Sequence, residues 1–158
     1  ADALTLHART RAQGYAGVAD REAFRTLAQH MKGSGVKTYG SGDVFTAEDA
    51  IRMIEEYKMD GVMFARGAIG NPFIFRETRS YIEKGEYEKP GRNEVLETAM
   101  RHFDLMVHYY GENLAGREMR KHMMAYLKGM SGAKESKAAL TSALTRDDYL
   151  RAIEPLMI

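Results

Sequence analysis

The chain has 158 residues, 44% of them apolar, enough for one modest core or for one core with an appended helical unit. Its 23 Lys and Arg against 22 Asp and Glu mean that any nucleic-acid surface must come from local clusters and not from overall charge. The absence of cysteine excludes disulfides and thiolate metal sites and favours a cytoplasmic location, and the absence of a long apolar run predicts no membrane partner.

The first part of the chain alternates short apolar runs with an amphipathic segment. Residues 3–7 and 36–39 are strand candidates, each followed by a glycine-containing loop. Between them, residues 20–32 have apolar side chains at helical spacing, and Gly33 with Gly35 supplies a stop. This order predicts strand, loop, helix and strand.

A second set of the same signals follows. Thr46 is a candidate N-cap with Asp49 three residues later, ahead of another segment with helical spacing. Residues 61–65 are apolar throughout, which predicts a strand buried on both faces. Pro72, with Asn71 as its cap, predicts the start of a further helix. The alternation predicts parallel strands joined by right-handed crossovers, as in an α/β layer or barrel.

The pattern changes after Gly85, where Pro and Gly stand among charged residues and no strand signal returns. We therefore divide the chain into an α/β domain, residues 1–85, and an all-α domain, residues 92–158. Three apolar stripes predict the helices of the second domain. They are Val95, Leu96, Ala99, Met100, Phe103, Met106, Val107 and Tyr110; Met119, Met123, Tyr126, Leu127 and Met130; and Leu150, Ile153 and Leu156. Thr145, with Asp148 three residues later, marks the start of the third helix.

The loops after the three strand candidates carry the features of a phosphate pocket. Ligands of barrels and open α/β sheets bind at the carboxyl ends of the strands, so these loops should share one face. Gly40, Gly42 and Gly67 allow backbone N–H groups to approach an anion, and Arg66 offers a charged fork. Glycines after strands are also ordinary turn formers. His7 could contact a ring or a phosphate, or could end a strand with a solvated imidazole.

A basic cluster accompanies the second apolar stripe of the helical domain. Lysine and arginine side chains suit phosphate contacts, and a tyrosine ring among them suits stacking on a base. The same residues could instead form the solvated face of a packed bundle. The cluster comprises Arg117, Arg120, Lys121, His122, Tyr126 and Lys128.

Together these segments resemble the tRNA-dihydrouridine synthase family, in its bacterial DusB-like branch. Residues 4–11, residues 40–44 and residues 60–75 are similar to the last strands of that family's barrel, and residues 60–75 are the most specific part. Arg120-Lys121-His122 and Tyr126-x-Lys128-Gly129 are similar to its C-terminal helical domain. The resemblance covers nearly the whole chain, in the family's order.

The resemblance implies the last strands of a (β/α)8 TIM barrel followed by a C-terminal helical bundle that binds tRNA. It also implies FMN, reduced by NAD(P)H, and the reduction of uridine in tRNA to 5,6-dihydrouridine with a cysteine as general acid. Ser41 stands where Asn is usual and Ala65 where Gly is usual, changes that a phosphate site can tolerate. By resemblance the FMN phosphate would be held by Ser41, Gly42, Asp43, Ala65, Arg66 and Gly67, with His7 and Arg9 near the flavin.

The resemblance also implies that several parts of the enzyme precede residue 1. These are the first barrel strands, a flavin-binding lysine and the cysteine acid, so we expect no catalytic residue here and no activity from this chain alone. Unpaired edge strands predict a homodimer or a swapped assembly. Two other readings remain open: a fragment of another phosphate-binding TIM-barrel flavoprotein, and a non-catalytic RNA-binding module in which the glycine loops are mere turns.

Overall fold

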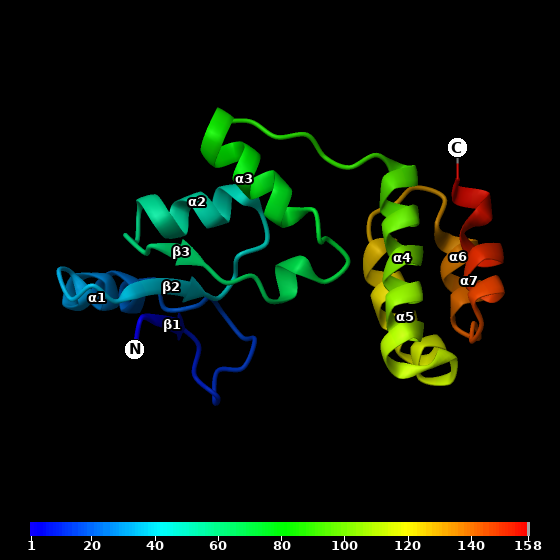
Figure 1. The fold of residues 1–158 in the computed structure, drawn as a ribbon, viewed down its shortest axis with the longest axis horizontal. Helices are drawn as coiled ribbons and strands as arrows, with labels where there is room; N and C mark the ends of the chain where they lie inside the picture. Colours follow the sequence, from blue (N-terminus) through cyan, green and yellow to red (C-terminus); the bar gives the residue numbers. More distant parts are fainter. Residues whose placement is uncertain (158) are drawn as a thin grey trace. The chain divides into compact units, whose positions relative to one another are not determined.

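The protein forms two compact units in a computed structural model that describes residues 1–157 (Figure 1). Unit 1 contains Ala1–Ala68 and Pro72–Glu88, and unit 2 contains Ile69–Asn71 and the chain from Lys89 onward. The passage at Glu88 and Lys89 falls between the limits that we drew at residues 85 and 92. Nothing in the sequence indicated that the short segment Ile69–Asn71 would belong to the helical unit.

Unit 1 is built on a parallel sheet of three strands, ordered β1 (Ala3–His7), β2 (Lys37–Ser41) and β3 (Gly61–Val62). The register aligns His7 with Ser41 at the carboxyl ends of β1 and β2. Because all three strands run in the same direction, the loops that follow them leave from one edge of the sheet, as expected for the end of an α/β barrel.

Three helices accompany the sheet of unit 1. Helix α1 (Arg21–Met31) begins at Asp20, whose side chain accepts hydrogen bonds from the first-turn amides. Helix α2 (Ala47–Glu55) begins with the capping box expected from Thr46 and its partner three residues later. Helix α3 (Ile74–Lys84) follows β3 and packs against α2 (Figure 1).

Two sequence predictions in unit 1 are wrong in detail. Strand β3 has two half-buried residues instead of a fully buried run over residues 61–65, and Met63 is 47% exposed. Strand β3 pairs with β2 and has no strand on its other side within the described residues. The Met63 N–H donates to the Gly40 carbonyl, and three residues later the chain forms the 3-10 helix η1 (Arg66–Ala68). Helix α3 begins at Ile74 after the buried Phe73, without the side-chain cap that we expected from Asn71.

The core of unit 1 lies between the sheet and its helices. The rings of Phe24 and Tyr57 are stacked with centroids 6.0 Å apart, and Met53 and Met59 are buried beside them. A Cβ atom on Gly40 would lie 2.2 Å from the Met53 sulfur. Gly40 therefore lets the Met53 side chain pack directly on the strand, a role that does not depend on what the following loop binds.

Unit 2 consists mainly of α-helices: α4 (Arg92–Tyr110), α5 (Glu112–Tyr126), α6 (Lys134–Leu140) and α7 (Arg146–Ile153), closed by the 3-10 helix η2 (Glu154–Leu156). Helix α4 packs against α5 and α7, and α6 packs against α5 and α7. The sequence stripes missed α6, because its seven residues are too few to show a helical period.

The core of unit 2 is formed by aromatic and aliphatic side chains from all four α-helices. The rings of Phe103 and Tyr149 lie 4.9 Å apart, and the Tyr149 hydroxyl donates to the Gly116 carbonyl at 2.8 Å. A Cβ on Gly116 would collide with the Leu144 carbonyl oxygen at 1.8 Å. Tyr110, which we had placed in the apolar stripe of α4, is 64% exposed. No helix within residues 1–157 combines the length and apolarity that a membrane crossing requires.

Candidate functional site

Asp43 is the centre of a polar network at the carboxyl edge of the unit 1 sheet. Its carboxylate accepts hydrogen bonds from Arg9 at 2.6 Å, from Arg66 at 3.0 Å and from the backbone N–H of Ala19 at 2.8 Å. These partners come from the loops after β1 and β3, whereas Asp43 follows β2. One carboxylate thus joins all three strand-end loops, and we call Arg9, Asp43 and Arg66 the Asp43 network.

The Arg9 side chain is almost entirely buried and donates its hydrogen bonds within the protein. Its side chain is 4% exposed, and besides Asp43 it donates to the carbonyls of Gly14 and Ala16 at 3.1 Å each and of Gly17 at 2.9 Å. The Arg9 guanidinium thus helps to hold the long loop after β1 in one shape, using its several donors in a fixed planar arrangement, and the Gln13 side chain adds hydrogen bonds to the carbonyls of Ala16 and Val18. In this position Arg9 organises the loop and keeps little surface for an external ligand.

The Asp43 network is positively charged overall. Burial alone would raise the pKa of Asp43, but hydrogen bonds from Arg9 and Ala19 and the charges of Arg9 and Arg66 outweigh it and lower that pKa below 3.8. At neutral pH two cations thus face one ionised carboxylate, which leaves a surplus of one positive charge. Arg66 carries the accessible part, because its side chain is 36% exposed against 22% for Asp43. The edge suits an anion.

His7 and Ser41 meet at the ends of β1 and β2. The His7 Nδ1 atom lies 3.1 Å from the Ser41 hydroxyl oxygen, as their paired register allows. Ser41 is fully buried, whereas the His7 residue is exposed. The serine thus orients the imidazole and has no surface of its own to offer a ligand.

The glycines at this edge are needed where loops approach one another. A Cβ on Gly67 would lie 2.2 Å from the Val44 carbonyl oxygen, and a Cβ on Gly42 would lie 2.9 Å from Ala19 Cβ. Gly42 also has φ 139°, a conformation that side chains disfavour. Ala65 is exposed beside Arg66. The strand-end loops are closely packed, so an anion would meet a preformed edge.

Two aromatic rings that our sequence analysis did not single out flank Arg66. The guanidinium carbon lies 4.1 Å from the ring centroid of Tyr15 and 5.4 Å from that of Phe45. Both rings are exposed, Tyr15 at 74% and Phe45 at 45%. Tyr15 is in the loop that Arg9 organises, so the only sequence signal for it was an aromatic residue in a glycine-rich loop.

The six RNA-binding candidates in unit 2 have different surroundings. Arg117 and Lys128 are exposed, and Lys121, also exposed, pairs with Glu118 within α5. Arg120 instead donates to the Thr141 carbonyl at 3.0 Å and has a buried Nε atom, so it links α5 to the end of α6. The accessible cations of this group are therefore Arg117, Lys121 and Lys128.

The remaining two candidates pack against His102 of α4, a residue that our sequence analysis did not select. The His102 and His122 rings lie 4.8 Å apart, and the Tyr126 hydroxyl oxygen is 3.4 Å from His102 Nδ1. Burial lowers the pKa of both histidines. Positive charge on His122 lowers the pKa of His102 further, and the charge of Lys121 does the same for His122. Tyr126 is 7% exposed, and burial raises its pKa. These rings mainly join α4 to α5.

Comparison with known proteins gives a consistent result along the chain. A family model described as "Dihydrouridine synthase" matches residues 1–156. A "Probable tRNA-dihydrouridine synthase" of Treponema pallidum is 45% identical over 133 residues, covering 84% of this chain and 39% of the relative. A protein of the same description from Mycobacterium leprae is 36% identical over 149 residues, covering 94% and 38%.

A relative with a more specific description is "tRNA-dihydrouridine synthase B" of Pseudomonas aeruginosa. It is 34% identical over 137 residues, covering 86% of this chain and 40% of the relative. Across these three relatives the chain matches 38–40% of the relative's length. Similarity to them therefore concerns less than half of each relative.

Proposed function

The chain belongs to the dihydrouridine synthase family, and from that premise we propose that it forms part of an FMN-dependent tRNA-dihydrouridine synthase. The proposed activity is the reduction of uridine in tRNA to 5,6-dihydrouridine with NAD(P)H as reductant, in the cytoplasm where such an enzyme would meet tRNA. Family membership supports the activity. The Asp43 network, an anion-attracting edge at the carboxyl ends of parallel strands, is the observation that supports this chain's share in it.

Arg66 is the residue that we propose as the main side-chain ligand of the FMN phosphate. Its guanidinium is partly exposed, is held by Asp43 and lies beside Gly67, where no side chain fits. The backbone of Gly42, Asp43, Ala65 and Gly67 would surround the anion. When bound, the flavin would supply the hydride for the reduction. The residues present fit a phosphate group, since the Asp43 network carries surplus positive charge.

Asp43 and Arg9 have different proposed roles from Arg66. An ionised carboxylate repels a phosphate, so Asp43 would orient Arg66 and would contribute only its backbone to the ligand. Arg9 would hold Asp43 and the loop after β1 in place. Ser41 would fix the His7 ring through Nδ1, leaving Nε2 as the atom to meet the flavin or its phosphate.

For tRNA we propose contacts with the exposed face of α5 and the turn after it. Arg117, Lys121 and Lys128 would meet phosphates, because their side chains are accessible. His122 is only partly buried and would lie at the border of this surface. Arg120 and Tyr126, packed within unit 2, would support the surface from behind.

Activity and RNA binding should separate in this chain. It contains no cysteine, so the general acid that we expect for the reaction is absent from it. With FMN, NADPH and unmodified tRNA we expect no dihydrouridine by mass spectrometry, but retention of tRNA in a filter-binding assay. Dihydrouridine formation by this chain would overturn the proposed inactivity. The proposed function would be overturned if a longer chain, extended to include the part that precedes the matched region in its relatives, neither formed dihydrouridine nor bound tRNA.

A further inference from the structure

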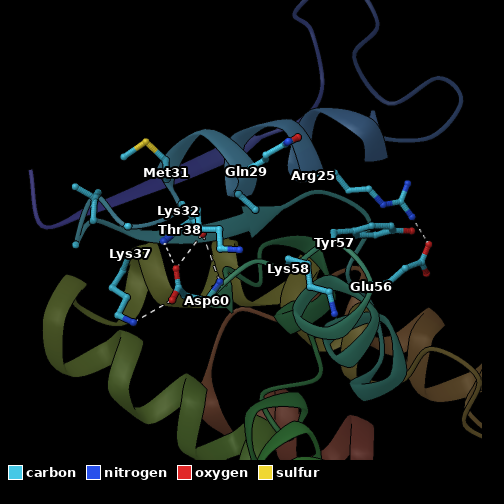
Figure 2. A pocket seen from close by; sticks show the side chains of 14 residues that line it. Arg25, Gln29, Met31, Lys32, Lys37, Thr38, Glu56, Tyr57, Lys58 and Asp60 are labelled. Carbon is cyan, nitrogen blue, oxygen red and sulfur yellow. Dashed lines mark hydrogen bonds and ion pairs between the residues drawn. The ribbon is translucent and has the colours of Figure 1, made fainter.

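A hollow lies at the opposite end of the unit 1 sheet from the Asp43 network. It has a volume of about 780 Å³ and is lined by the second half of α1, the turn to β2 and the turn between α2 and β3 (Figure 2). On β2 it reaches Lys37 and Thr38 at the amino end, whereas the Asp43 network follows the carboxyl end at Ser41. We call this hollow the amino-end pocket. Its size is that of typical small-molecule sites.

The floor of the amino-end pocket is largely apolar. Ala28 and Met31 of α1 and Val36 of the following turn line it together with Tyr57, whose ring is almost fully buried. The guanidinium carbon of Arg25 lies 4.9 Å from the Tyr57 ring centroid and forms one wall. An apolar floor beside a flat guanidinium suits a planar ring.

The rim of the amino-end pocket has more cations than acids. Arg25 pairs with Glu56 at 2.6 Å and Lys37 pairs with Asp60 at 3.0 Å, as Figure 2 shows. Asp60 also accepts hydrogen bonds from Thr38, which hold it in place. Glu56 and Asp60 are the only acids among the described lining residues, and Glu22, outside the lining, also pairs with Arg25. Two lining cations have no acidic partner within the lining. The two are Lys32 and Lys58.

Lys58 occupies a backbone conformation that lysine disfavours. Its φ is 60°, and among the described residues Asp43 is the only other non-glycine with positive φ. Glycine or asparagine would adopt this turn at lower cost, and strained residues are concentrated at functional sites. Lys32, at the C-cap of α1, has a structural reason to be basic, because a cation stabilises a helix C-terminus. Lys58 likewise follows the end of α2, whose C-cap is Glu56, and its left-handed turn closes that helix. What points to a ligand is that both lysines line the same pocket.

We propose that the amino-end pocket binds a phosphate monoester of mononucleotide size. The ring would lie on the apolar floor against the Arg25 guanidinium, which itself covers the buried Tyr57 ring, and the doubly charged phosphate would meet the ammonium groups of Lys32 and Lys58. This site is separate from the Asp43 network and does not depend on the proposed reduction of uridine.

The probe for this site is adenosine 5′-monophosphate, titrated into the ¹⁵N-labelled chain and followed by NMR. We expect saturable shifts at Gly33, Gly35 and Lys58, with adenosine or inorganic phosphate alone binding about tenfold more weakly or worse because each lacks one of the two contacts. The proposal is overturned if these amides do not shift at millimolar nucleotide, if only Gly42 and Gly67 shift, or if inorganic phosphate binds equally well.

Three variants test the residues themselves. Lys58→Gly should weaken nucleotide binding about tenfold and at the same time raise Tm, because it removes a cation and relieves the positive φ. Lys32→Gln should also weaken binding. Lys84→Gln, an exposed lysine at the end of α3, is the matched control and should leave binding unchanged. Unaltered nucleotide affinity in Lys58→Gly would refute the assignment, whatever its Tm.

Discussion

Different interactions stabilise the interior of each of the two units. In unit 2, helices meet through a continuous apolar core that includes fully buried rings such as Phe103 and Tyr149. In unit 1, the strand β1 is mostly exposed, and its following loop is held by side-chain hydrogen bonds of Arg9 and Gln13. Unit 2 is therefore stabilised mainly by apolar burial, and the carboxyl edge of the unit 1 sheet by a charged network.

This difference indicates how each unit would respond to its surroundings. Unit 2 buries its core side chains among its own helices. A three-stranded parallel sheet has two unpaired edges, at β1 and β3, and its exposed strand residues invite further strands or a second chain. The homodimer or swapped assembly thus stays a prediction that concerns unit 1.

The largest expected effect is on the core of unit 2. Phe103→Ala should cost about 3–5 kcal/mol of unfolding free energy, because a fully buried ring leaves a cavity beside Tyr149. Amide hydrogen exchange should then accelerate in α4 and α5 and stay unchanged in β2. An equal acceleration in β2 would show that the two units do not unfold separately.

A smaller effect is expected at the Asp43 network. Asp43→Asn should destabilise unit 1 by about 2 kcal/mol, since it leaves the buried guanidinium of Arg9 without a charged partner. The matched control is Asp104→Asn in unit 2, where the ion pair with Arg146 is half-exposed, and its cost should stay below about 1 kcal/mol. Equal costs in urea unfolding would mean that the Asp43 network is an ordinary surface ion pair.

As the pH is lowered, the folding stability of unit 2 should fall at a higher pH than the stability that the Asp43 network gives to unit 1. Folding lowers the pKa of His102 from 6.5, mainly by burial, so below pH 6.5 the unfolded chain takes up this proton first and stability falls with pH. Folding also lowers the pKa of Asp43 from 3.8, so its contribution is complete above that pH and is lost as pH falls through the lower folded value. Burial lowers the pKa of His122 from 6.5 as well, so in unfolding followed across pH the double variant His102→Gln/His122→Gln should remove the first loss; a first loss that persists in it would contradict the assignment.

The smallest effects should be on RNA affinity. Lys128→Gln should weaken tRNA binding a few-fold and reduce the salt dependence by about one phosphate contact. Lys134→Gln, an exposed lysine of α6, is the control and should bind tRNA as the unaltered chain does. If both variants behave alike in binding assays at several salt concentrations, the basic face of α5 and its turn is not the contact surface.

Local signals in the sequence predicted the local features of the fold. The capping boxes at Thr46 and Thr145 formed as expected, because a cap depends only on residues three apart. The sequence also predicted that glycine-containing loops follow the strands, and the structure has them there. Their close packing was not evident, since the need for glycine at Gly67 comes from the distant backbone of Val44.

Features that depend on residues far apart in the chain could not be predicted. Arg9 and Asp43 are 34 positions apart, and only the paired register of β1 and β2 brings their loops together. The same holds for His102, which reaches His122 and Tyr126 across the α4–α5 pair. Sequence spacing thus gave candidate site residues, but which of them are buried or already paired within the protein required the structure.

The central claim is that Arg66, oriented by Asp43, forms part of an FMN phosphate site. The direct measurement is an FMN titration by flavin fluorescence with a longer chain that includes the upstream part of its relatives, in the unaltered and the Arg66→Gln forms. We predict tight binding by the unaltered chain and a loss of at least about tenfold in the variant. Equal affinities in the two forms, or no FMN binding by either, would contradict the claim.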